Sequence, residues 1–228
     1  MSQTNGRSAK ERLMECAREE FFAKGYTKAS LRKICANAGV TTGALYFFFK
    51  DKAELFSEIV SPPYYELIDL ISKYFAKSEY EVISADVRSL PSINFRPISS
   101  KFGDELIRLL YENKKEFLIL INGSEGSEYS DCIERFVELM ERCYRSFAEK
   151  MCLRLHGGQI NDYVLHWLAH QSVSSIIHLL THQADEECAK HNVEIIINCI
   201  TGNRIHAAVE VPGGFERTIQ YAGKDQKQ

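Results

Sequence analysis

Four histidines form two pairs in which the imidazoles lie one helical turn apart, the spacing of a metal site on a helix. His166 and His170 make the first pair, His178 and His182 the second, and Asp162 precedes the first by another turn. A zinc site is therefore conceivable. However, at 100° per residue the two pairs point about 120° apart, and the glutamate of an H-E-x-x-H motif is absent. We interpret these histidines as pocket or subunit-interface residues and predict no bound metal, no cofactor and no catalytic site.

The cysteines offer a second possible chemistry. They are Cys16, Cys35, Cys132, Cys143, Cys152, Cys188 and Cys199. Their number is odd and no C-x-x-C pair occurs, so reduced and mostly buried thiols are expected. Redox sensing is the alternative for the three in residues 132–152, but their spacing along an apolar stripe favours core packing.

Between residues 30 and 52, hydroxyl groups and cations suited to phosphate binding are interspersed with apolar residues. Ser30 and Arg32 open one predicted helix, Tyr46 lies in the next, and Lys52 begins a third. Backbone amides at helix starts also favour anions. Phosphate contacts fix register and base contacts specify sequence, and Thr42 is the best group here for a base edge.

The elements that position these groups are two short helices joined by a tight turn, a helix-turn-helix over about 30–49. Gly39 allows the chain to reverse and Val40 fills the space between the helices. A second helix of eight residues spans about 12 Å, the width of the major groove. Its first residues, Thr42, Gly43 and Ala44, are small enough for a close approach to bases.

Residues 25–55 read GYTKASLRKICANAGVTTGALYFFFKDKAEL. This segment resembles the signature of TetR/AcrR-type transcriptional regulators, in which glycine-aromatic, Ala-Gly-Val, Leu-Tyr and Lys-x-x-Leu follow in this order. The sequence departs from the usual pattern at Cys35, where Ala is common, and at Phe47-Phe48, a pair that usually includes His or Tyr. Phe48 is thereby limited to apolar contacts, for example with a thymine methyl.

The resemblance implies an all-helical homodimeric repressor whose larger domain binds a small molecule and thereby moves the two heads off a double-stranded DNA operator. The family's phosphate contacts carry over to Tyr46 and Lys52. Its base contacts carry over to Thr42, Gly43, Ala44 and Phe48. We add Ser30 and Arg32 as phosphate-directed groups, and expect a pseudo-palindromic operator with half-sites about 34 Å apart.

The charge distribution agrees with a DNA-binding head and a separate effector-binding body. The 228-residue chain has a formal net charge of -3. Residues 1–56 carry ten basic and six acidic residues, and the remainder carries 18 and 25. A basic head on an acidic body indicates that the two parts meet different partners.

Apolar residues recur every three or four positions through most of the chain, which predicts an all-α fold. We expect helices over 8–24, 30–38, 42–48, 51–60, 63–77, 101–112, 114–122, 128–156, 162–184 and 187–201. Pro62 and Pro63 predict a break or kink near residue 61, and 207–221 has a hairpin pattern.

The expected divisions are a DNA-binding head (1–56), an effector-binding and dimerisation domain (57–205) and a tail (206–228) that is a hairpin or disordered. With no signal core and no apolar run long enough to cross a bilayer, a cytoplasmic protein is expected.

Helical phase also suggests an aromatic-lined effector pocket between about 63 and 184, with the helices 162–184 and 187–201 paired against a second subunit. The candidate pocket residues are Tyr111, Phe117, Phe136, Met140, Cys143, Tyr144, Phe147, Trp167, His170 and Gln171. Two other functions stay open: a metal-dependent helical-bundle enzyme, and an interaction adaptor with a vestigial helix-turn-helix. The effector itself is not indicated.

Overall fold

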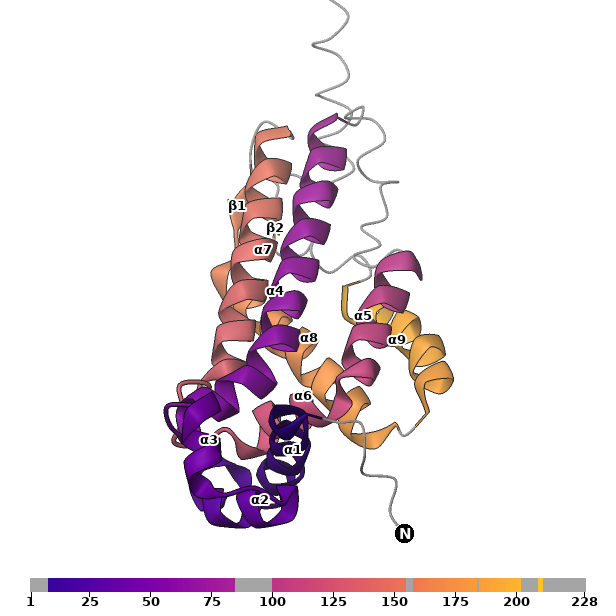
Figure 1. The fold of residues 1–228 in the computed structure, drawn as a ribbon. Coiled ribbons are helices and arrows are strands. Elements are labelled where there is room, and N and C mark those ends of the chain that lie inside the picture. The colour runs from indigo at the N-terminus through magenta and orange to yellow at the C-terminus, as the bar shows by residue number, and fades with distance from the viewer. Residues whose placement is uncertain (1–7, 85–99, 155–157, 184, 202–208, 211–228) are drawn as a thin grey trace, which may run out of the picture. The chain divides into compact units, whose positions relative to one another are not determined.

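The computed structural model describes residues 8–84, 100–154, 158–183, 185–201 and 209–210, which form nine helices and one small sheet (Figure 1). The helices are α1 (Ala9–Lys28), α2 (Leu31–Ala38), α3 (Thr42–Phe48), α4 (Lys52–Ser84), α5 (Ser100–Glu112), α6 (Lys114–Gly123), α7 (Cys132–Arg154), α8 (Asp162–His182) and α9 (Glu186–Thr201). The strands are β1 (Gln159–Ile160) and β2 (Val209–Glu210). The predicted all-α class is confirmed.

The start of α1 follows directly from its sequence. The Ser8 hydroxyl accepts from the Glu11 backbone N–H, and the Glu11 carboxylate accepts from the Ser8 N–H, which completes the predicted capping box. At Gly25 the backbone leaves the helical region (φ 69°), where the helix was expected to end, and one more turn follows to Lys28.

Of the break or kink predicted near residue 61, the break is wrong. Helix α4 runs from Lys52 to Ser84 with Pro62 and Pro63 inside it. Each proline removes a backbone donor that the helix would use, but Val60, Pro63 and Tyr64 are buried at this point. The free energy of burying this face offsets the missing hydrogen bonds, so the helix continues.

The chain divides into two compact units that are not contiguous in sequence. Unit 1 comprises residues 1–66 and 112–132, and unit 2 comprises 67–111 and 133–228. The first division falls inside α4, between Glu66 and Leu67. Compared with the expected boundary after residue 56, the compact unit that holds the helix-turn-helix also includes α6 and the turns that follow it.

Unit 2 is built around aromatic and aliphatic side chains from several helices. Phe75 of α4 meets Tyr144 of α7 edge to face, with ring centroids 5.5 Å apart, and Lys150 of α7 pairs with Glu79 of α4 at 2.5 Å. These contacts hold α7 beside the second part of α4 (Figure 1). Helices α8 and α9 pack against each other.

Two residues of the predicted tail form a short strand. Val209 and Glu210 pair antiparallel with Ile160 and Gln159, so the strand that they form joins a partner from the α7–α8 connection. An isolated hairpin is marginally stable in water, whereas β1 provides a strand already held between two helices. The second predicted strand, within 215–221, lies outside the described residues.

None of the helices in the described ranges combines the length and apolarity needed to cross a membrane.

Candidate nucleic-acid interface

The turn between α2 and α3 has the geometry that the sequence predicts. Gly39 adopts a left-handed conformation (φ 66°, ψ 36°), which terminates α2. The Val40 N–H donates to the Cys35 carbonyl at 3.0 Å, and the Thr41 hydroxyl accepts from the Ala44 N–H at 3.1 Å. Thr41 therefore caps α3, so that α2 and α3 form a helix-turn-helix.

Helix α3 separates a core face from an outer face. Leu45 and the C-cap residue Phe49 are buried, whereas Thr42 and Gly43 are exposed. Beside them Tyr46 is 54% exposed, so this phenol is available for contact with a partner. Ala44 and Phe48 are half-buried.

Phe47 is a surface residue that we did not select from the sequence. It is 83% exposed, the largest exposed fraction among the large apolar side chains of the described residues. Its helical phase was the available signal: Leu45 and Phe49 mark the core face, and at 100° per residue Phe47 lies about 160° from either. Phe48, which we predicted as a base contact, lies about 60° from Leu45.

Thr42 also has an internal partner. Burial raises the pKa of the Cys35 thiol, and a hydrogen bond with the Thr42 side chain partly offsets this effect. The Thr42 side chain thus contacts α2, although the residue is exposed on α3.

Lys52 is anchored by the end of α1. Its Nζ donates to the Thr27 carbonyl at 3.2 Å and to the Ala29 carbonyl at 3.4 Å, and lies 4.7 Å from the centroid of the Tyr26 ring. A lysine ammonium has three donors, so two carbonyl contacts leave one for an anion. The contacts place this positive charge near Ser30, the N-cap residue of α2.

The other predicted phosphate-directed groups stand at the beginning of α2. Ser30 and Arg32 are both exposed, and the Ser30 hydroxyl accepts from the Lys33 N–H at 3.4 Å. Lys24 and Lys28 are exposed near the end of α1. In contrast, Lys10 pairs with Glu58 at 2.7 Å, so part of its charge is neutralised within the unit.

Helix α6 packs against α1 through a close backbone contact. A Cβ on Gly123 would lie 3.1 Å from the Gly25 Cα, so the absence of a side chain allows the two helices to approach. Thr27 donates to the Glu125 carbonyl at 2.7 Å, and Arg18 pairs with Glu116 at 2.5 Å. These contacts make α6 part of the structure that carries the helix-turn-helix.

The segment after α6 is held to α4 by Tyr129. Its ring lies edge to face with that of Tyr64, with centroids 5.5 Å apart, and its hydroxyl lies 2.9 Å from the Ser57 hydroxyl. Burial raises the pKa of the Tyr129 phenol. The phenol is therefore a neutral structural group of unit 1.

The candidate effector residues fall into several environments. Tyr144 and Phe147 are buried on α7, and the Tyr144 hydroxyl lies 2.7 Å from that of Ser172 on α8. Burial raises the pKa of Tyr144 well above its ordinary range. Phe136, Met140 and Cys143 are half-buried on α7, and burial raises the pKa of Cys143 to about 11.

The remaining candidates for the effector pocket do not lie on α7. Tyr111 donates to the Gln183 carbonyl at 2.9 Å, and Phe117 is buried in unit 1. Trp167, His170 and Gln171 are exposed on α8. Tyr144 and Phe147 are thus the candidates that the structure places in the interior of unit 2.

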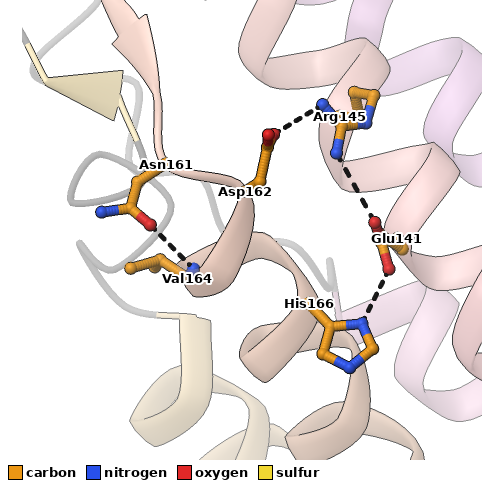
Figure 2. Close-up of polar contacts among 6 residues, drawn as sticks. All are labelled: Glu141, Arg145, Asn161, Asp162, Val164 and His166. Atoms are coloured by element: carbon orange, nitrogen blue, oxygen red, sulfur yellow. Dashed lines mark hydrogen bonds and ion pairs between the residues drawn. The ribbon is translucent and has the colours of Figure 1, made fainter.

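His166, one member of the first histidine pair, belongs to a surface charge network between α7 and α8 (Figure 2). The Nδ1 of His166 lies 2.9 Å from Glu141, and Arg145 pairs with Glu141 at 3.5 Å and with Asp162 at 2.8 Å. The His166 hydrogen bond is the main cause of a lowered pKa at Glu141. In the described parts of the chain, no three His, Cys, Asp or Glu side chains are grouped so as to hold a metal ion.

Comparison with known proteins connects this geometry to a family. Residues 13–59 match the family model described as bacterial regulatory proteins, tetR family. The chain is 29% identical over 145 residues to the HTH-type transcriptional regulator AcrR of Shigella flexneri, which covers 62% of this chain and 66% of AcrR. It is 37% identical over 51 residues to the HTH-type transcriptional repressor BepR of Brucella suis, which covers 22% of this chain and 24% of BepR. Each alignment spans less than two-thirds of the relative's length.

A solved structure extends the similarity of fold to most of the chain. The structure of SmeT, the repressor of the Stenotrophomonas maltophilia multidrug efflux pump SmeDEF, is similar with a TM-score of 0.55 and 18% identity. The match covers 91% of this chain and 96% of the SmeT chain. At this identity the similarity establishes the fold.

Proposed function

We propose that this chain, which belongs to the TetR family of DNA-binding transcriptional regulators, is a homodimeric repressor released from a pseudo-palindromic operator by a small molecule. The observation that carries the DNA-binding part is the outer face of α3, where Thr42, Gly43, Tyr46 and Phe47 are exposed together. An exposed pair of aromatic residues is costly for a surface that only faces water.

In the proposed complex, α3 enters the major groove and its small N-terminal residues Thr42, Gly43 and Ala44 approach base edges. Phe47 supplies apolar contact, for example with thymine methyl groups; Phe48 keeps its proposed base contact from its half-buried position. The phosphate contacts are those of Ser30, Arg32, Tyr46 and Lys52. The anchoring of Lys52 by two carbonyl oxygens supports its role, because it holds the charge in one position.

The proposed dimer forms through α8 and α9. Tyr163 and Trp167 on α8 and Ile195 on α9 are exposed large apolar residues of these helices. Pairing each helix with its symmetry mate covers them in a four-helix interface. Two heads about 34 Å apart then meet successive major grooves on one side of the DNA.

The proposed effector domain is unit 2, where the rings of Tyr144 and Phe75 meet edge to face, the Tyr144 hydroxyl lies near that of Ser172, and Phe147 is buried on the same helix as Tyr144. This composition favours a largely apolar, aromatic effector. The other candidates from the sequence remain proposals at the positions described above.

Release requires that the effector bind better to the conformation that does not bind DNA. The covalent path supports a route for this coupling: α5 ends at Glu112 and α6, which packs against α1, begins two residues later at Lys114. A displacement of α5 by the effector would pull on α6 and thereby on the head. A tenfold loss of operator affinity needs about 1.4 kcal/mol of differential binding.

The test combines DNA binding with the state of association. Fluorescence anisotropy compares the affinity of the full chain for a duplex from the DNA upstream of its own gene with that for a random duplex, at several salt concentrations. Sedimentation of the complex gives its stoichiometry, and a panel of small uncharged aromatic compounds is added last. Two chains per duplex and a preference for the upstream DNA support the proposal. Equal affinity for both duplexes contradicts it and favours the adaptor.

A further inference from the structure

The head contains a buried carboxylate that its DNA-contacting surface does not use. Glu20 of α1 is only 5% exposed. A buried charge is costly unless it is paired and hydrogen-bonded. Both conditions are met: Lys33 Nζ lies 2.7 Å from Glu20 Oε2, and the Ser30 backbone N–H also donates to this carboxylate.

Both partners of Glu20 belong to the beginning of α2. Ser30 is the N-cap residue of that helix, and Lys33 is in its first turn. The first N–H groups of a helix lack intrahelical acceptors, and the helix dipole places partial positive charge there. Glu20 therefore provides a negative charge where α2 requires one.

The opposite end of α2 receives the opposite charge from the same helix. Arg12, two turns earlier in α1, donates from Nε to the carbonyl of Ala38 at 3.1 Å. Ala38 is the last residue of α2, where carbonyl groups lack partners and the dipole is negative. Helix α1 thus complements the dipole of α2 at both ends.

We propose that Glu20 and Arg12 are positioning residues that clamp α2 at both ends and thereby set the orientation of α3 for sequence-specific DNA reading. They do not touch DNA. They act through α2, whose Cys35 carbonyl and Gly39 cap hold the turn that leads into α3. The inference rests on operator binding by the head, as proposed above.

The clamp differs from an ordinary ion pair in what loss of Lys33 does. In Lys33→Gln, Glu20 still accepts from the Ser30 N–H and still faces the positive end of α2. An ion-pair role predicts that Lys33→Gln and Glu20→Gln lower the affinity ratio equally, whereas the clamp predicts a smaller loss for Lys33→Gln.

The experiment compares binding to a duplex selected by the wild-type chain from a random pool with binding to an unselected duplex. Glu20→Gln is expected to lower the ratio of the two affinities about tenfold and Arg12→Met about fivefold, as charge-assisted bonds at the two ends are lost. Arg12→Lys, which keeps the charge, is expected to retain most of the ratio. Amide hydrogen exchange at Ser30 and Leu31 is expected to accelerate in Glu20→Gln.

Glu15→Gln is the matched control, because it removes the same charge from an exposed position of α1 that pairs only locally with Arg18. Thermal unfolding confirms that each variant is folded at the assay temperature. Ratios for Glu20→Gln and Arg12→Met equal to that of Glu15→Gln would overturn the clamp, as would equal losses in Lys33→Gln and Glu20→Gln. Failure of the wild-type chain to prefer its selected duplex would instead refute operator recognition.

Discussion

At the scale of single residues, α3 carries two nearby apolar side chains whose roles differ. Phe47 is 83% exposed and meets the Phe48 ring edge to face with centroids 5.2 Å apart, whereas Leu45 is fully buried. We expect Phe47→Ala to weaken DNA binding about tenfold, by loss of apolar contact, with little change in the free energy of unfolding. Anisotropy titration and urea unfolding measure the two quantities.

Leu45→Ala is the comparison for that variant. It removes a buried side chain and is expected to lower the free energy of unfolding by about 2–5 kcal/mol. If Phe47→Ala destabilises the chain as much as Leu45→Ala does, the exposed ring has a structural role instead.

The Glu20 carboxylate predicts a pH dependence. Its hydrogen bond with Lys33 lowers its pKa in the folded chain from the ordinary value of 4.5. Its contribution to stability is therefore complete above about pH 4.5 and is lost as the pH falls through the lowered folded-state pKa. Urea unfolding of the wild type and Glu20→Gln from pH 7 to pH 3 is expected to give curves that converge on the acid side. A constant difference would show that Glu20 does not titrate in this way.

At the scale of elements, the contact between α1 and α6 depends on the absence of a side chain. Gly123→Ala would place a Cβ 3.1 Å from the Gly25 Cα and 3.5 Å from the Phe21 carbonyl oxygen. Because backbone atoms cannot move aside alone, the two helices must separate, and we expect a loss of about 1–3 kcal/mol in unfolding free energy. Gly43→Ala is the control, since its Cβ would meet only Thr41 Oγ1, at 3.8 Å. Equal urea midpoints for the two variants would contradict the prediction.

Replacing a proline of α4 is expected to raise the free energy of unfolding, in contrast to Gly123→Ala. Pro62 is exposed within a continuous helix, so Pro62→Ala restores a backbone hydrogen bond without disturbing a buried contact. We expect the free energy of unfolding to rise by about 1–2 kcal/mol, the helical gain being partly offset by a more flexible unfolded chain. Thermal and urea unfolding measure it, and a decrease would show that the proline ring is needed where it stands.

The helix starts and the helix-turn-helix could be predicted from the sequence, because each is determined by a few neighbouring residues. Ser8 with Glu11 and Gly39 with Thr41 act within one turn of the chain. The continuity of α4 through Pro62 could not be predicted from the sequence, because burial of Val60 and Tyr64 overrides the local helix propensity. The pairing of Val209 with Ile160 and the Gly25–Gly123 contact likewise join distant segments, which periodicity does not relate.

At the scale of the whole molecule, the head is not separable at a point in the sequence. Residues 1–66 alone lack α6 and Tyr129, which pack against α1 and α4. We expect a fragment of residues 1–66 to bind the dye ANS and to unfold at a lower temperature than the same unit in the full chain, because its apolar surfaces are exposed. Circular dichroism and dye fluorescence provide the measurement. A fragment as stable as the full chain would show that 112–132 contributes nothing to the head.

The discontinuity of unit 1 also sets an order of events during synthesis. Residues 1–66 are made first, and their partners in 112–132 follow only after the intervening segment, which belongs to unit 2. At roughly 5–20 residues per second, this delay amounts to several seconds for each chain. Throughout that interval the DNA-reading helices exist without the surface on which α1 rests. A newly made chain therefore reaches its complete DNA-binding form only once more than half of it has been translated.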